Sequence, residues 1–212
     1  MKDMSLYHRM QYESINTTFE ACQRLAEKDK SILREMASQY MEFRTELQQF
    51  TDRYFSSYCK RICFDTKRSA CCSYESIIVF FADEVINYLF GGEQNFPHIL
   101  EKLRNIKPSD HCVYLGDSGC LWTVRPISCA MFFCDDAKKE IFGTFPEAEL
   151  EWQDFIRREK LFTWPDQPVL FDILEEFFIK RGVNTPHMYC HRSPGLLKIK
   201  ARSRQISYSS GS

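Results

Sequence analysis

The sequence predicts a mainly α-helical protein, with a long N-terminal helix or helical hairpin followed by a cysteine-rich helical domain that contains loops. Three observations support this prediction. Apolar residues recur at intervals of three and four over the first quarter of the chain, no Gly or Pro precedes Gly91, and eight of the ten cysteines fall in two short blocks. A chain of 212 residues can bury a hydrophobic core, so it does not need disulfides simply to fold.

The N-terminal region, residues 1–57, carries an apolar stripe with a period of about 3.5 residues, which is typical of a long amphipathic helix. The polar stretch around Asp29 is either a surface part of one helix or the turn of a helical hairpin. The stripe fits a coiled-coil homodimer or a helix packed back on its own domain, and its aromatic residues and Cys22 favour the second. Its members are Tyr12, Ile15, Phe19, Cys22, Ala26, Leu33, Met36, Tyr40, Phe43, Leu47, Phe50 and Tyr54.

Further helices are expected in the domain at residues 58–200. The run IIVFFADEVINYLF predicts a helix that ends at Gly91-Gly92, although its β-branched start leaves a short strand open. Pro97 opens a short helix, and Gly-Asp-Ser-Gly at 116–119 predicts a tight turn between two extended arms. Pro126 begins a helix, and two amphipathic helices follow, at residues 146–162 and 168–181.

The charge distribution gives little sign of a nucleic-acid partner. The net charge is −1, and the basic residues that follow Glu176 are typical of a solvated end. Residues 201–212 are rich in Ser and are expected to form a flexible tail.

The sequence also predicts a cytoplasmic protein with no membrane partner. The first twenty residues lack the apolar core of a signal peptide, and the longest apolar run is interrupted by Asp83 and Glu84. Thiols stay reduced in the cytosol, so clustered cysteines there indicate metal binding or catalysis rather than disulfides.

The clustered cysteines form two blocks, and all eight are candidate metal ligands. The first block has the spacing C-x3-C-x7-C-C and the second has C-x7-C-x8-C-x4-C. Thiolates select iron–sulfur clusters, zinc or cuprous copper, and neither spacing matches a zinc ribbon or a ferredoxin. We therefore expect an iron–sulfur cluster or Zn²⁺, with the cluster preferred. The first block is Cys59, Cys63, Cys71 and Cys72, and the second is Cys112, Cys120, Cys129 and Cys134.

Residues near Cys129 have the properties of a metal environment. Cys129 lies in the first turn of the helix predicted after Pro126, where backbone N–H groups favour a thiolate. Arg125 can offset negative charge, and nearby aromatic residues can screen the site from water. Cys134 falls five residues after Cys129, off its face on a regular helix. The aromatic residues are Trp122, Phe132 and Phe133.

The pattern C-x-Y-L-x3-G-C-x4-R-P-x2-C-x2-F at 112–132 resembles the family of zinc- or iron-chelating domains named for its CxxCxxCC cysteine motif. Two cysteine blocks separated by a helical segment, and SPGLL at 193–197, are similar too. The first block keeps the final doublet of the family motif but not its two-residue gaps. The resemblance implies binding of zinc or an iron–sulfur cluster, and it implies no established reaction.

Other donors lie in HMYCH near the C-terminus, where His187, Cys190 and His191 could complete the site, and at His111. No phosphate-binding loop, dinucleotide fingerprint or nucleophile elbow is present.

The sequence leaves three hypotheses for the function. The first is a cluster that serves electron transfer or redox sensing with a redox partner protein. The second is a zinc-stapled interaction protein without redox activity, and the third is a cluster-dependent enzyme.

Overall fold

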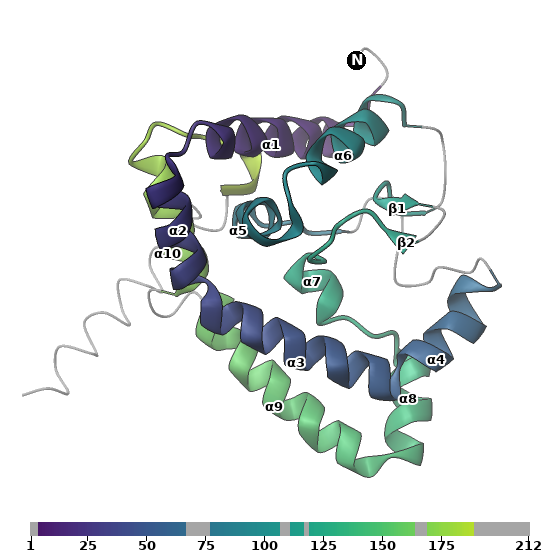
Figure 1. Ribbon diagram of the computed structural model, residues 1–212. Coiled ribbons are helices and arrows are strands. Elements are labelled where there is room, and N and C mark those ends of the chain that lie inside the picture. The colour runs from purple at the N-terminus through teal and green to yellow at the C-terminus, as the bar shows by residue number, and fades with distance from the viewer. Residues whose placement is uncertain (1–3, 67–76, 107–110, 117–118, 164–168, 189–212) are drawn as a thin grey trace, which may run out of the picture.

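The computed structural model describes residues 4–66, 77–106, 111–116, 119–163 and 169–188, and it confirms a mainly α-helical fold (Figure 1). The two strands form a small antiparallel hairpin, β1 (Leu115–Gly116) and β2 (Gly119–Cys120). The helical elements are α1 (Leu6–Gln23), α2 (Glu27–Met36), α3 (Ser38–Tyr54), α4 (Ser56–Cys59), η1 (Lys60–Phe64), α5 (Phe81–Ile86), η2 (Asn87–Gly91), α6 (Asn95–Arg104), α7 (Ile127–Ala130), α8 (Asp135–Thr144), α9 (Pro146–Thr163), α10 (Leu170–Ile179) and η3 (Pro186–Met188).

The N-terminal region consists of three successive helices rather than the one long helix or the hairpin expected from the sequence. The first break follows α1, and α2 then begins after Ala26. The polar stretch around Asp29 lies in the first turn of α2, where acidic side chains interact favourably with the helix dipole. The second break falls at Ala37, between α2 and α3. In Figure 1 the three helices pass around α5, which is seen end-on.

The apolar stripe of these helices is buried within the chain itself. Helix α1 packs on α5, α6 and η3, α10 packs on α5 and α9, and α3 packs on α9. The burial supports intramolecular packing of the stripe, while a homodimer remains a prediction. Buried members of the stripe are Ile15, Cys22, Leu33, Tyr40, Phe43, Leu47 and Phe50.

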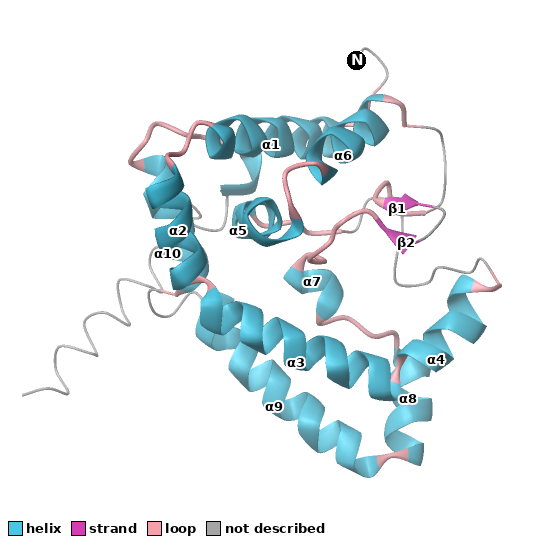
Figure 2. Ribbon diagram, in the orientation of Figure 1, coloured by secondary structure: helices cyan, strands magenta, loops and turns pink. Residues whose placement is uncertain are grey.

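The predicted elements between residues 77 and 188 are largely confirmed (Figure 2). Helix α5 continues into the π-helix η2, which ends at Gly92, whose φ of 89° is in the region that favours glycine. No strand forms at the β-branched residues 77–79. Helices α6, α9 and α10 and the hairpin lie where the sequence places them.

The prediction of one helix after Pro126 is wrong in one respect, because the chain forms two helices there. Helix α7 is a single turn, and Cys134 is the N-cap residue of α8. Among the described residues, no helix is long and apolar enough to cross a membrane.

Aromatic packing connects the two parts of the chain that carry the cysteine blocks. The ring of Phe55, just before α4, stacks on Phe133, with centroids 3.7 Å apart. Phe133 in turn makes an edge contact with Trp152 of α9, at 5.0 Å. These rings fix the segment between α7 and α8 against the start of α4.

Candidate metal centre

Five of the eight candidate cysteines line a single pocket of about 390 Å³, which we call the thiol pocket. Cysteines of both blocks contribute, although 49 to 70 positions separate them in the sequence. In Figure 1, α4 and the β1–β2 hairpin lie on the same side of the molecule. The five cysteines are Cys59, Cys63, Cys112, Cys120 and Cys129.

The first block enters the pocket from α4 and η1. Cys59 is the last residue of α4, and Cys63 lies in the π-helix η1, a type of helix that often occurs at functional sites. Burial raises the pKa of the Cys59 thiol, and the nearby Cys63 and Cys134 raise it further, whereas Arg125 lowers it. Cys71 and Cys72 lie outside the described residues.

The second block enters the pocket from the hairpin and α7. Cys112 is buried, and its Sγ accepts a hydrogen bond from the backbone N–H of Tyr114 at 3.4 Å. Cys120 is exposed on β2, and Cys129 is half-buried on α7. Cys134 does not line the pocket, but it is close enough to Cys59 to affect that thiol.

Polar side chains from the core hold the segment that precedes Cys129. The Asp83 carboxylate accepts hydrogen bonds from the backbone N–H of Ile127 at 2.9 Å and of Phe80 at 3.1 Å. The Asn87 side chain accepts from the N–H of Val124 at 3.0 Å and donates to its carbonyl. Because α5 and η2 are buried, these bonds fix the start of α7.

A buried arginine supports the same segment from the opposite side. Arg44 of α3 donates to the carbonyl oxygen of Arg125 at 2.7 Å and to the hydroxyl of Tyr40 at 2.8 Å. Burial raises the pKa of Asp83 to about 7, although its two backbone hydrogen bonds and the positive charge of Arg44 oppose that shift. Residues 124–129 are therefore fixed by side chains of α3, α5 and η2.

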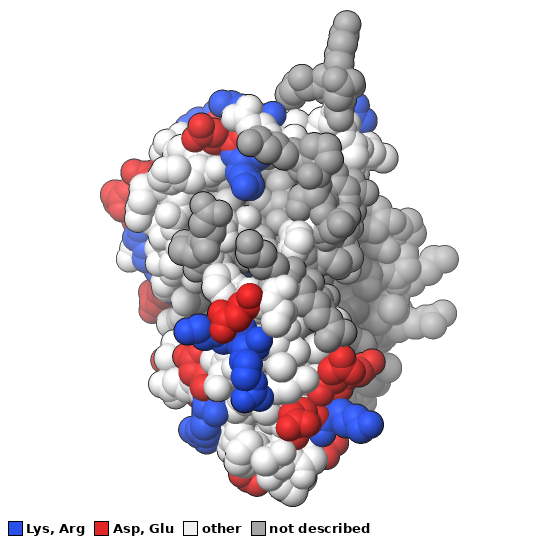
Figure 3. Space-filling view, turned by 90° about the vertical axis from the view of Figure 1, so that its right-hand side faces the viewer, with Lys and Arg blue, Asp and Glu red and all other residues white. Residues whose placement is uncertain are grey.

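Apart from its thiols, the described wall of the thiol pocket is mainly apolar, with two cations and the polar side chains of Gln48, Thr51 and Ser56. Arg125 and Lys60 line it, and no Asp or Glu is among its described lining residues. On the face shown in Figure 3, the described acidic and basic side chains are interspersed. The aromatic lining residues are Phe64, Tyr114, Trp122, Phe132 and Phe133.

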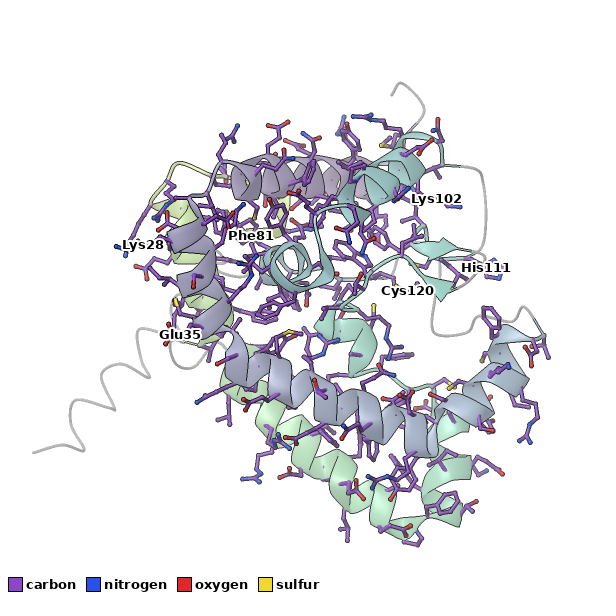
Figure 4. The ribbon with its side chains drawn as sticks, viewed as in Figure 1. Lys28, Glu35, Phe81, Lys102, His111 and Cys120 are labelled. Atoms are coloured by element: carbon purple, nitrogen blue, oxygen red, sulfur yellow. The ribbon has the colours of Figure 1, made fainter. Side chains whose placement is uncertain are left out.

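His187 belongs to a different site. Its Nδ1 is 2.6 Å from Oε1 of the buried Glu84, and its Nε2 is 2.9 Å from Nε2 of Gln11. Both ring nitrogens are thus engaged in the core, and His187 does not line the thiol pocket. His111 lies at the outer edge of the hairpin, whereas Cys120 is nearer the centre of the molecule (Figure 4). Cys190 and His191 lie outside the described residues.

The described thiols share the pocket without forming a compact single-ion site. Within the described part of the chain, no three His, Cys, Asp or Glu side chains are placed to hold one metal ion. Four thiolates around one zinc ion need neighbouring sulfurs about 3.8 Å apart, given a Zn–S distance of about 2.3 Å and tetrahedral geometry. A cluster of several irons carries its thiolates on different metal atoms, so it bridges sulfurs that stand further apart.

Sequence reasoning missed the residues that position the second block. Arg44, Asp83 and Asn87 each bond to backbone groups far away in the sequence, which no local pattern reveals. The available signal was the Asp83-Glu84 pair within an otherwise apolar helix, because charged residues on a buried face need specific partners.

Comparison of the chain with family models, with curated proteins and with solved structures found no match.

Proposed function

We propose that this protein holds an iron–sulfur cluster in the thiol pocket, through cysteines of both blocks. The observation that carries the proposal is the presence of five thiols from two distant segments in one pocket. Cysteines used only as small apolar residues are buried among core side chains, as Cys22 is in α1. The thiol pocket instead gathers thiols of graded exposure, from the buried Cys112 to the exposed Cys120.

The surroundings of the pocket support a negatively charged centre. A cluster with four thiolate ligands carries net negative charge, and the two lining cations, Arg125 and Lys60, complement that charge. The raised pKa of Cys59 means that this thiol is protonated in the metal-free protein, so metal binding there releases a proton. Aromatic walls lower the solvent exposure of the centre and thereby influence its potential.

The preference for a cluster over a single zinc ion comes from the sequence, since neither cysteine block has the spacing of a zinc ribbon. Among the described residues no three donors are placed to hold a metal ion, so the ligands of either centre would have to come together when the metal binds. The candidate ligands are Cys59, Cys63, Cys112, Cys120 and Cys129, with Cys134 adjacent and Cys71 and Cys72 to be tested. A centre of this kind would serve electron transfer or redox sensing with a redox partner protein.

The test is anaerobic purification followed by a visible spectrum and by analysis of iron, acid-labile sulfide and zinc. We expect a coloured protein with iron and sulfide. Cys120→Ala and Cys129→Ala should lose the colour and the iron. Cys22→Ala is the matched control, because Cys22 is buried in α1 and does not line the pocket.

Two results would contradict the proposal. A colourless chain with stoichiometric zinc would support the zinc-stapled alternative, in which chelation abolishes cooperative unfolding. Loss of colour in Cys22→Ala to the same extent as in Cys129→Ala would show that the thiol pocket does not hold the centre.

A further inference from the structure

A chain of buried hydrogen bonds runs from the core of the protein to one of the candidate ligand cysteines. It starts at Glu84 of α5, a fully buried residue whose Oε1 is 2.6 Å from Nδ1 of His187. Nε2 of His187 is 2.9 Å from Nε2 of Gln11 on α1. The side-chain carbonyl of Gln11 accepts a hydrogen bond from the hydroxyl of Tyr114. The backbone N–H of Tyr114 in turn donates to Sγ of Cys112 at 3.4 Å.

The contacts of Gln11 determine where the hydrogens of this chain lie. Because Oε1 of Gln11 faces the Tyr114 hydroxyl, the amide directs its NH₂ group at His187. Nε2 of His187 is therefore an acceptor, and the ring hydrogen is on Nδ1, which donates to the Glu84 carboxylate. Both polar atoms of the Gln11 side chain are thus paired, and the pairing fixes its orientation in the core.

Tyr114 connects Gln11 with the thiol pocket. Its side chain is 1% exposed, and a buried hydroxyl that loses its partner costs free energy. Tyr114 and Cys112 are two residues apart, and both line the pocket. The hydroxyl of Tyr114 is held by α1 while its backbone holds the Cys112 thiol, so the position of Tyr114 determines that of Cys112.

We infer that Gln11 is a positioning residue of the thiol pocket, which acts on Cys112 through Tyr114. The Glu84–His187 pair supports it by fixing the orientation of the Gln11 amide. The inference rests on the proposed function in that Cys112 is a candidate ligand, although none of the contacts involves a metal. Helix α1 thus takes part in forming the pocket, although none of the described lining residues belongs to it.

The experiment measures alkylation of Cys112 by iodoacetamide in the full-length, reduced and metal-free chain, with mass spectrometry to assign each labelled cysteine. Cys22 is the internal reference, because it is fully buried and its labelling reports unfolding of the core. We expect Gln11→Leu to raise the labelling rate of Cys112, relative to that of Cys22, by about tenfold. A factor of this size corresponds to the loss of one buried hydrogen bond.

Further variants show whether the effect passes through Tyr114. Tyr114→Phe removes only the hydroxyl and should raise the labelling of Cys112 as much as Gln11→Leu does. The double variant should add little to either single change, since both remove the same hydrogen bond. The matched control is Thr18→Val, because Thr18 is also fully buried on α1 but donates to Glu84 rather than holding Tyr114. It should leave the labelling of Cys112 relative to Cys22 unchanged.

A second measurement needs no variant and remains valid if Gln11→Leu does not fold. Long-range ¹H–¹⁵N correlation spectra of the metal-free wild-type chain at about pH 7.5 show which ring nitrogen of His187 carries the hydrogen. We expect the hydrogen on Nδ1, as the orientation of the Gln11 amide requires.

The outcomes separate this inference from the proposed function. Unchanged labelling of Cys112 in Gln11→Leu, or labelling of Cys112 and Cys22 that rises in parallel, overturns the positioning role. A hydrogen on Nε2 of His187 overturns the orientation of Gln11 on which that role depends. All of these measurements are made without metal, so a wild-type protein that lacks iron and sulfide contradicts the proposed function alone.

Discussion

Asp83 should make the stability of this protein depend on pH in an unusual direction. The pKa of this buried carboxyl is about 7 in the folded protein, against 3.8 as its ordinary value, chiefly because burial disfavours the charged form. The folded state therefore binds more protons than the unfolded state between these two pH values. Its contribution to stability is fully present below about pH 4, declines as the pH rises, and levels off above about pH 7.

The size of the effect follows from the two pKa values. The whole decline amounts to about 4 kcal/mol, and roughly 2.5 kcal/mol of it falls between pH 5 and pH 8. Exposed carboxylates change stability in the opposite direction, since salt bridges lower the pKa of groups such as Asp154. A comparison with a variant that cannot titrate isolates the contribution of Asp83.

The informative variant is Asp83→Asn. Its single carbonyl oxygen can accept from only one of the two backbone N–H groups, of Ile127 and Phe80, so the other N–H loses its acceptor at a cost of about 1–3 kcal/mol. At pH 5 the variant should be less stable than the wild type by that amount. By pH 8 the difference should have disappeared or reversed, because only the wild type has to bury a charge.

The assay is equilibrium unfolding in urea of the reduced, metal-free protein at intervals between pH 5 and pH 8. The quantity of interest is the difference in free energy of unfolding between wild type and Asp83→Asn. Parallel pH profiles for the two proteins would refute the reasoning, since they would mean that Asp83 does not titrate in this range. If Asp83→Asn instead became progressively less stable relative to the wild type as the pH rises, the expected direction of the pH effect would be refuted.

Three other substitutions test particular contacts, each by the free energy of unfolding in urea. Asn87→Ala removes both side-chain hydrogen bonds to Val124 and should lower the free energy of unfolding by about 1–3 kcal/mol. It should also lower the iron content proposed for the thiol pocket. The control, Asn16→Ala on the surface of α1, should not change the iron content. Phe133→Ala removes the ring stacked on Phe55 and should cost about 3–5 kcal/mol; a cost below 1 kcal/mol would contradict the packing. His187→Ala leaves the buried Glu84 without its imidazole partner and should cost roughly 3 kcal/mol, whereas the exposed His98→Ala should be neutral.

Much of the secondary structure was accessible from local patterns. The helix that ends at Gly91-Gly92 and the turn at Gly116–Gly119 use the conformational freedom of glycine, and the helix entered through Pro97 uses the fixed φ of proline, so all three have local signals. The positions at which the N-terminal region breaks into three helices could not be predicted from such local signals. The polar stretch around Asp29 lies inside α2 rather than at either break, and the stripe keeps its period from Met36 to Tyr40 across the second break.

The breaks have their cause in tertiary packing. Helices α1, α2 and α3 surround α5 in Figure 1, and one straight helix could not bring both Ile15 and Leu47 into the same small core. Each change of direction keeps the stripe on the inside, since Leu33 before the second break and Tyr40 after it are both buried. Hydrophobic periodicity thus identifies the buried face correctly, but the curvature depends on the elements that lie beneath it.

The polar interior was equally inaccessible from the sequence, and it explains how the thiol pocket is held. Segment 124–129 is short and includes only a single turn of helix, so its own hydrogen bonds cannot fix the position of Cys129. Asp83, Asn87 and Arg44 supply hydrogen bonds to its backbone instead, and backbone contacts do not require particular side chains in the segment.

The two halves of the thiol pocket are therefore held in place differently. The second block depends on buried polar groups of α3, α5 and η2, whereas the first block is carried by α4 and the π-helix that extends it. A substitution at Asn87 should consequently disturb the position of Cys129, and the metal binding proposed for it, while the first block keeps its helix; far-UV circular dichroism of the variant should remain that of the wild type.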